Sequence, residues 1–177
     1  MNGGIASNTV ILGVGNLLWG DEGFGPRTVA RLMDAEQVPA GVEIFDGGTQ
    51  GLYLLPIIQA ARRLLVFDCV DFGAAAGRIM VLRDREIPVF FGQRPLSLHQ
   101  TAFTDVLAAA ELTGRMPEAV TLVGVQLEDI DAWGGDLTPS VAGAMEAAIR
   151  IGLEELAAWA GLISNASPAV RPEPVEG

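Results

Sequence analysis

The chain has 177 residues, half of them hydrophobic and 19% charged, and this composition favours one globular domain with a well-covered core. Its formal net charge of −11 argues against nucleic acid and membrane surfaces as partners, because both attract Lys and Arg, and leaves a metal ion or a basic protein face. One cysteine excludes an intramolecular disulfide, and no stretch offers the about 20 apolar residues of a membrane span, so we expect a soluble cytoplasmic protein.

The first predicted element is a buried parallel strand at residues 9–14, an apolar and β-branched run. A glycine-rich loop with the acids Asp21 and Glu22 follows, and then a helix is predicted over 26–36. The loop begins like a dinucleotide-binding motif, but Leu18 stands where the third glycine belongs, and the two acids would repel a phosphate. A cation site or a purely structural turn suits this loop better.

A second strand is predicted over 42–45, followed by a turn-rich loop that starts with Asp46 and a helix over 52–61. The run 63–70 is almost continuously apolar and carries Asp68 near its end. This pattern is typical of a central parallel strand.

A fourth strand is predicted over 78–83. The connection before it is too short for a helical crossover, so we expect it to pair antiparallel with the preceding strand. Residues 84–96 contain two prolines and are predicted to be irregular. Ser97 then suits the N-cap of a helix that continues to residue 113.

A fifth apolar strand is predicted over 119–125, and Thr138 suits the N-cap of a final helix. We expect a single domain over 1–163 and a disordered tail over 164–177, where three prolines and few apolar side chains occur.

This alternation of strands and helices predicts a three-layer α/β/α sandwich with a twisted, five-stranded, mostly parallel sheet. Right-handed crossovers bring the loops after the first three strands to one rim of the sheet. Ligands bind at this rim in open α/β sheets.

The residue types that are present exclude several kinds of catalytic and metal site. The single histidine, His99, excludes zinc sites with several imidazoles, and no nucleophile elbow supports a serine triad. Cys69 follows Asp68 on a strand, so the two side chains face opposite sides, and Cys69 is predicted to be a buried core residue. There remain Glu22, Asp68 and His99, which suit a divalent transition metal such as nickel or zinc.

Each of these residues also has a structural alternative. His99 could serve as a hydrogen-bonding residue at a helix start, and Asp68 could cap a helix or accept backbone amides. Asp46 could stabilise its own turn, and this is the role we favour for it.

Several motifs in register resemble the hydrogenase maturation endopeptidases, which process the large subunit of [NiFe] hydrogenases. The resemblance covers nearly all of 9–160, and its motifs lie at 13–25, 46–51, 67–73, 97–100 and 122–126. The turn at 70–73 and the sequence Ser97-Leu98-His99-Gln100 look most like the subgroup that serves membrane-bound uptake hydrogenases.

The resemblance implies that Glu22, Asp68 and His99 match the metal-contacting positions of the family. It also implies the α/β/α fold, nickel supplied by the substrate rather than a nucleotide, and removal of a C-terminal peptide from the nickel-loaded hydrogenase large-subunit precursor. Asp46 is a candidate general base. We expect a monomer, with maturation chaperones as further partners.

Two other functions fit parts of the sequence. A metallochaperone could use the same three residues to pass nickel to a partner without cleaving it. A nucleotide-binding α/β protein would share the sheet and the glycine loop, although Leu18 and the loop acids count against it.

Overall fold

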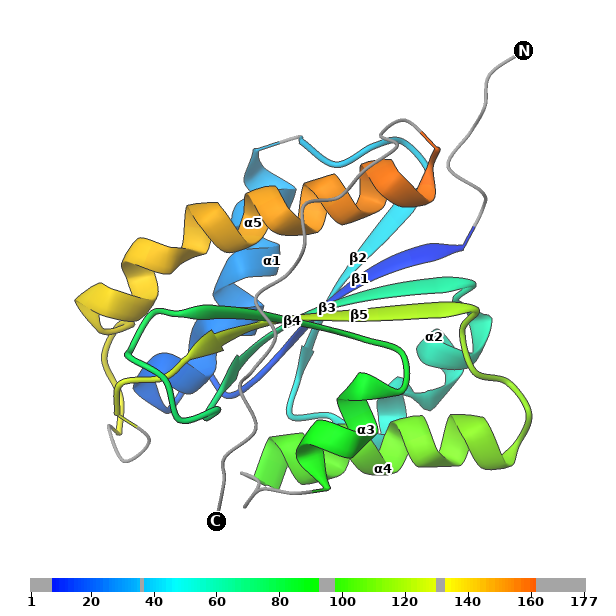
Figure 1. The fold of residues 1–177 in the computed structure, drawn as a ribbon, viewed down its shortest axis with the longest axis horizontal. Coiled ribbons are helices and arrows are strands. Elements are labelled where there is room, and N and C mark those ends of the chain that lie inside the picture. The colour runs from blue at the N-terminus through cyan, green and yellow to red at the C-terminus, as the bar shows by residue number, and fades with distance from the viewer. Residues whose placement is uncertain (1–7, 36, 93–97, 130–132, 162–177) are drawn as a thin grey trace.

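The computed structural model describes residues 8–35, 37–92, 98–129 and 133–161 (Figure 1). The strands are β1 (Thr9–Val14), β2 (Val42–Gly48), β3 (Arg63–Val70), β4 (Ile79–Arg83) and β5 (Ala119–Gln126). The α-helices are α1 (Phe24–Asp34), α2 (Leu55–Ala60), α3 (Glu86–Phe91), α4 (Leu98–Leu112) and α5 (Pro139–Trp159). Short 3₁₀ turns, η1 (Gly20–Gly23) and η2 (Gly51–Leu54), precede α1 and α2.

The five strands form one sheet in the order β2-β1-β3-β5-β4. All neighbours run parallel except β4, which is antiparallel to β5, so the predicted mostly parallel sheet is confirmed. The predicted pairing of the fourth strand with the third is wrong, because β1 and β5 occupy both edges of β3. The short connection indicated the direction of β4 but not its neighbour.

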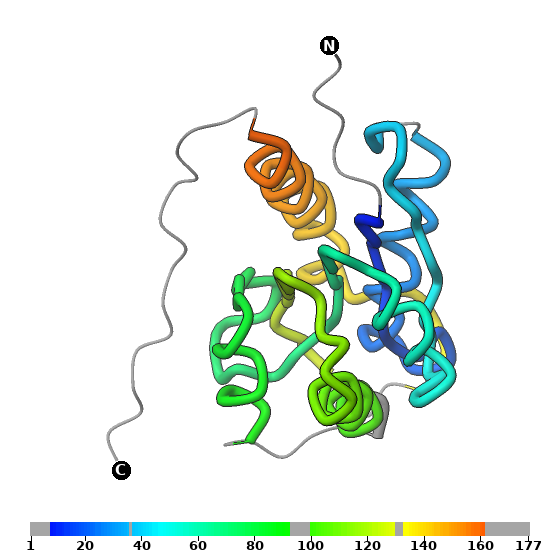
Figure 2. Tube along the Cα trace, turned by 90° about the vertical axis from the view of Figure 1, so that its right-hand side faces the viewer, coloured from blue at the N-terminus to red at the C-terminus, as the bar shows by residue number. Residues whose placement is uncertain are grey.

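Helices cover both faces of the sheet, which gives the three predicted layers (Figures 1 and 2). Helices α1 and α5 contact each other on one face, and α4 contacts both α2 and α3 on the other. The side chains of β3 alternate between the two cores. Phe67 and Cys69 enter the core beneath α1 and α5, whereas Val66 and Val70 enter the core beneath α2, α3 and α4.

Residues 86–91 form α3, which corrects the prediction that 84–96 is irregular. Pro88 lies in the first turn of this helix, where a missing N–H removes no hydrogen bond. The Glu86 carboxylate accepts a hydrogen bond of 2.9 Å from the Arg83 amide and so joins α3 to the end of β4.

The final helix begins at Pro139 after Thr138, as predicted, but the Thr138 side chain makes no capping bond to the helix. Its hydroxyl instead donates to the Asp21 carboxylate. Further along α5, Gly152 packs so close to the sheet that a Cβ there would lie 2.5 Å from Cζ of Phe67.

The predicted helix over 52–61 consists of η2 and α2, with Pro56 in the first turn of α2. Ser97, predicted as an N-cap, and residues 164–177, predicted as a tail, lie outside the described residues. Within the described ranges, no helix is both long enough and apolar enough to cross a bilayer.

Candidate functional site

The carboxyl ends of β1 and β3 carry two of the predicted metal ligands. These strands are parallel neighbours, so η1, which follows β1 and carries Glu22, lies at the same rim as Asp68 near the end of β3. Gly25 permits this close packing, because a Cβ there would lie 2.2 Å from the Val14 carbonyl oxygen and 2.3 Å from that of Phe67. The predicted convergence of these two loops is therefore observed.

Asp68 is a buried carboxylate, only 1% exposed. It lies between Val66 and Val70 in the alternation of β3 and thus faces the side of the sheet that α4 covers. Its Oδ1 accepts a hydrogen bond of 2.8 Å from the Cys69 amide. This bond agrees with the alternative that Asp68 accepts a backbone amide, and it also fixes the direction of the carboxylate.

The first turn of α4 lies against the end of β3. The buried Gln100 side chain donates a hydrogen bond of 2.9 Å from Nε2 to the Cys69 carbonyl oxygen. His99 precedes Gln100 in α4, but its side chain lies outside the described part of the chain. Among the side chains that the structure describes, no three from His, Cys, Asp and Glu form a metal-binding group. The set of Glu22, Asp68 and His99 therefore stays a prediction.

Asp46 is exposed at the end of β2, one strand away from Glu22. Its Oδ1 accepts a hydrogen bond of 3.0 Å from the Gly48 amide. The Gly48 carbonyl in turn accepts a bond of 3.1 Å from the Gly15 amide, which joins the loops after β2 and β1. The turn-stabilising role that the sequence favoured for Asp46 is thus observed.

Gln126, the last residue of β5, organises the turn that follows β3. Its Oε1 accepts a hydrogen bond of 2.8 Å from the Phe72 amide, and its Nε2 donates one of 3.0 Å to Oδ1 of Asp71. Two of the motifs found in the sequence, at 67–73 and 122–126, therefore meet at the rim.

Asp21 has a structural role that the sequence did not reveal. Its buried carboxylate accepts hydrogen bonds from the amides of Glu128 (2.9 Å), Asp129 (3.3 Å) and Thr138 (2.8 Å) and from the Thr138 hydroxyl (3.1 Å). Asp21 was predicted together with Glu22 as part of an acidic cation loop. The structure instead uses it to fasten the loop between β5 and α5 beside Glu22. The only signal in the sequence was its position in the glycine-rich loop, because its donors lie more than 100 positions away.

Cys69 is a fully buried core residue, as predicted. Burial raises the pKa of its thiol far above the ordinary range, and the negative charges of Asp68, Asp21 and Glu22 raise it further. Both effects disfavour the thiolate, which agrees with the core role predicted for Cys69 rather than a nucleophilic one.

We expect Cys69 in the folded protein to react with iodoacetamide at pH 8.5 about 100-fold more slowly than in urea, because reaction requires opening of the core. Intact mass over time measures the rate. Since the thiol pKa is higher in the folded state, its contribution to stability is full below about pH 8.5 and declines above it, and Cys69→Ala should weaken this alkaline dependence. Equal labelling rates in buffer and urea would contradict the burial of the thiol.

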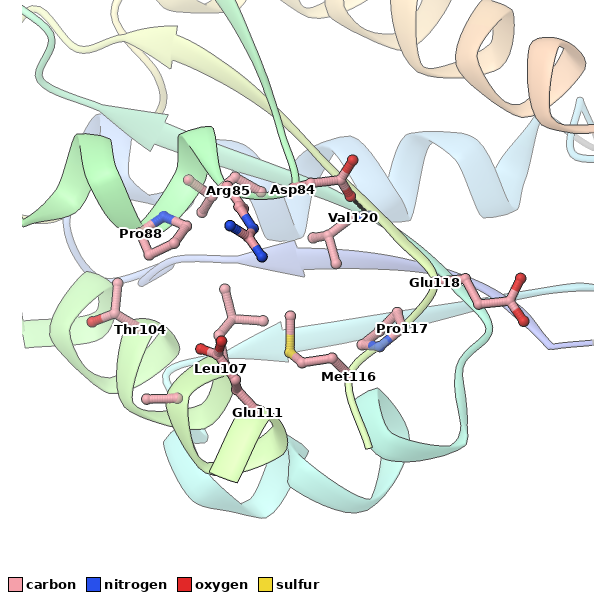
Figure 3. A pocket seen from close by; sticks show the side chains of 12 residues that line it. Asp84, Arg85, Pro88, Thr104, Leu107, Glu111, Met116, Pro117, Glu118 and Val120 are labelled. Carbon is pink, nitrogen blue, oxygen red and sulfur yellow. Dashed lines mark hydrogen bonds between the residues drawn. The ribbon is translucent and has the colours of Figure 1, made fainter. Parts of the chain in front are cut away.

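A cavity of about 300 Å³ lies away from this rim, between α3, α4 and the start of β5 (Figure 3). Leu107, Met116 and Val120 give it an apolar wall. Its lining residues come from α3, from α4 and from the segments that follow β4 and lead into β5, and they include neither Glu22 nor Asp68. The candidate site is therefore the rim and not this cavity.

Comparison with known proteins gives a consistent set of matches. The sequence profile of the hydrogenase maturation proteases (HycI) matches residues 26–155. The hydrogenase expression/formation protein HupD of Rhodobacter capsulatus is 49% identical over 150 residues, which cover 85% of this chain and 71% of that protein. The hydrogenase 2 maturation protease of Escherichia coli K12 is 41% identical over 142 residues, 80% of this chain and 85% of that protein.

The fold is similar to solved structures of such proteins. The hydrogenase maturating endopeptidase HybD from Escherichia coli superposes with a TM-score of 0.77 at 39% sequence identity, over 84% of this chain and 91% of that chain. The [NiFe] hydrogenase maturation protease HybD from Thermococcus kodakarensis superposes with a TM-score of 0.68 at 20% identity, over 84% of this chain and 99% of that chain, and supports the fold alone.

Proposed function

This chain belongs to the hydrogenase maturation protease family, and from this premise we propose that it removes a C-terminal peptide from the precursor of a [NiFe]-hydrogenase large subunit. The match of residues 26–155 to the hydrogenase maturation protease family is the observation that supports the endopeptidase activity. The rim at the ends of β1 and β3 supports the location of the site, because it brings η1, which carries Glu22, next to the end of β3, which carries Asp68.

Nickel in this proposal belongs to the substrate. Glu22, Asp68 and His99 would contact a nickel ion that the precursor already carries, and so bring the bond to be cleaved to the rim. The donor types suit a divalent transition metal. The bond from Gln100 to the Cys69 carbonyl supports the assignment of His99, because it holds the first turn of α4 against the strand end that carries Asp68.

Hydrolysis at this site would use polarisation of the peptide carbonyl or activation of a water by the substrate's metal ion. Asp46 is the candidate general base. One of its oxygens accepts a hydrogen bond from the Gly48 amide, and its exposed position near the end of β2 leaves the carboxylate accessible to water. We place the reaction in the cytoplasm, with the precursor and maturation chaperones as partners and the protein acting as a monomer.

Intact mass of a [NiFe]-hydrogenase large-subunit precursor, incubated with this protein with and without nickel loading, tests the proposal. We expect loss of a C-terminal peptide from the nickel-loaded precursor only. Transfer of nickel without a shorter product would favour the metallochaperone. Cleavage of both forms would contradict nickel recognition while leaving the endopeptidase activity intact.

Two of the three proposed ligands can be tested with His99→Ala and Glu22→Gln. We expect each to lower the processing rate at least about 100-fold, because a misplaced substrate loses the advantage of orientation. Glu111→Gln, an exposed carboxylate on α4, is the matched control and should leave the rate unchanged. Intact processing by His99→Ala would refute the role of that residue.

A further inference from the structure

Three large apolar side chains stand exposed beside η1. Leu17 (49% exposed) and Leu18 (60%) precede η1 in the loop after β1, and Trp133 (69%) belongs to the loop after β5. We refer to Leu17, Leu18 and Trp133 as the apolar rim. Single exposed apolar residues are common on protein surfaces and need no explanation. These three instead belong to two loops that contact each other.

Specific contacts hold the two loops together. The Gly134 amide donates a hydrogen bond of 2.7 Å to the Leu18 carbonyl, and Trp19 forms an isolated β-bridge with Trp133. The two tryptophan rings meet edge to face, with centroids 4.9 Å apart and planes at 89°. Trp133 is therefore fixed by its neighbour and still presents most of its surface to solvent.

A second set of contacts holds the loop after β5 against α1 and η1. The Arg27 guanidinium donates to the Gly135 carbonyl at 3.1 Å and to the Asp136 carboxylate at 3.2 Å. The buried Asp21 carboxylate binds the amides on either side of this segment, those of Glu128 and Thr138. These contacts restrain the described residues 133–138 before any partner arrives, which lowers the conformational entropy that binding there costs.

The apolar rim adjoins the proposed site. Leu17 packs over Gly23, where a Cβ would lie 3.5 Å from Leu17 Cδ2, and Gly23 directly follows Glu22. Leu17 therefore places one end of the apolar rim beside Glu22. Tryptophan is enriched among the residues that dominate the binding energy of protein interfaces, and Trp133 is the restrained aromatic residue of this surface.

We propose that Leu17, Leu18 and Trp133 form the docking surface for apolar side chains of the large-subunit precursor next to the bond that is cleaved. This inference rests on the proposed endopeptidase function and adds to it the surface that supplies substrate affinity. The apolar rim contributes binding and no chemistry, so its loss should raise KM and leave kcat unchanged.

The test is steady-state processing of the nickel-loaded precursor by the double variant Leu18→Ser/Trp133→Ser. We expect KM to rise at least tenfold while kcat stays within twofold of the wild type. Leu112→Ser is the matched control, since Leu112 is 89% exposed at the far end of α4 and should change neither constant. The single variant Trp133→Phe keeps an aromatic ring and should retain most of the wild-type affinity for the precursor. Thermal unfolding of each variant confirms that the fold is retained.

Binding of the precursor to the immobilised protein separates the two proposals. Unchanged KM and unchanged affinity in the double variant would overturn the docking surface and leave the endopeptidase function intact. Wild-type protein that binds the precursor without cleaving it would overturn the endopeptidase function, and the affinities of the variants would still decide the role of the apolar rim. Absence of both binding and cleavage would overturn both.

Discussion

Asp21→Ala should lower the free energy of unfolding by about 3–5 kcal/mol, because it removes the buried, charged acceptor of three backbone amides and one hydroxyl. The Asp21 carboxylate is 1% exposed and accepts the hydrogen bonds of Glu128, Asp129 and Thr138 described above. Hydrogen bonds to a charged group are worth about 1.5–3 kcal/mol each, although their contributions do not add fully. Urea-induced unfolding followed by circular dichroism measures the loss.

Asp136→Ala is the matched control for Asp21. Asp136 lies in the same loop and pairs with Arg27, but its side chain is 94% exposed, so its replacement should change stability by at most about 0.5 kcal/mol. We also expect the loop between β5 and α5 to become susceptible to limited proteolysis in Asp21→Ala and not in Asp136→Ala. A loss below about 1 kcal/mol in Asp21→Ala would show that the carboxylate does not hold this loop.

Gly25→Ala is the second large effect. The added Cβ would lie 2.2 Å from the Val14 carbonyl oxygen and 2.3 Å from the Phe67 carbonyl oxygen, and both oxygens belong to central strands that cannot yield. The start of α1 must then move away from the sheet, and Glu22 moves with it. We expect a loss of about 3 kcal/mol or more, measured by thermal unfolding, together with loss of processing.

Gly143→Ala provides the opposite outcome for the same chemical change. Gly143 lies within α5, and a Cβ there would meet nothing within 4 Å. Because alanine restricts the unfolded chain and favours the helix, this variant should be stabilised by about 0.5–1 kcal/mol. Similar destabilisation by both substitutions would mean that the contacts of Gly25 are not the cause.

The strands were predictable because their signal is local. The apolar runs of β1 and β3 coincide with the predicted ranges 9–14 and 63–70. Helix α3 was missed because Pro88 was interpreted as a breaker, although proline is tolerated in the first turn of a helix. The neighbour of β4 was predicted wrongly because strand order is decided by segments that are distant in sequence.

The candidate site was predictable where topology alone positions a residue. Glu22 and Asp68 reach the same rim because β1 and β3 are parallel neighbours, which right-handed crossovers allow one to expect. The role of Asp21 could not be predicted, because its partners are backbone amides of a loop whose path no local pattern specifies. The two neighbouring acids look alike in sequence, and only the fold separates the buried structural carboxylate from the one proposed to bind metal.

The two ends of the described fold lie close together at the amino ends of the parallel strands, on the side of the sheet opposite the rim. The Asn8 carbonyl accepts the Arg62 amide at 2.7 Å, and the Trp159 carbonyl accepts the Arg63 guanidinium, so both ends of the fold meet at the start of β3. A short linker could therefore join residue 161 to residue 8 in a circular permutant. New termini at Gly114, in the exposed connection between α4 and β5, would leave from the same side. The order of the elements along the chain would then change, while each loop at the rim would still follow the same strand.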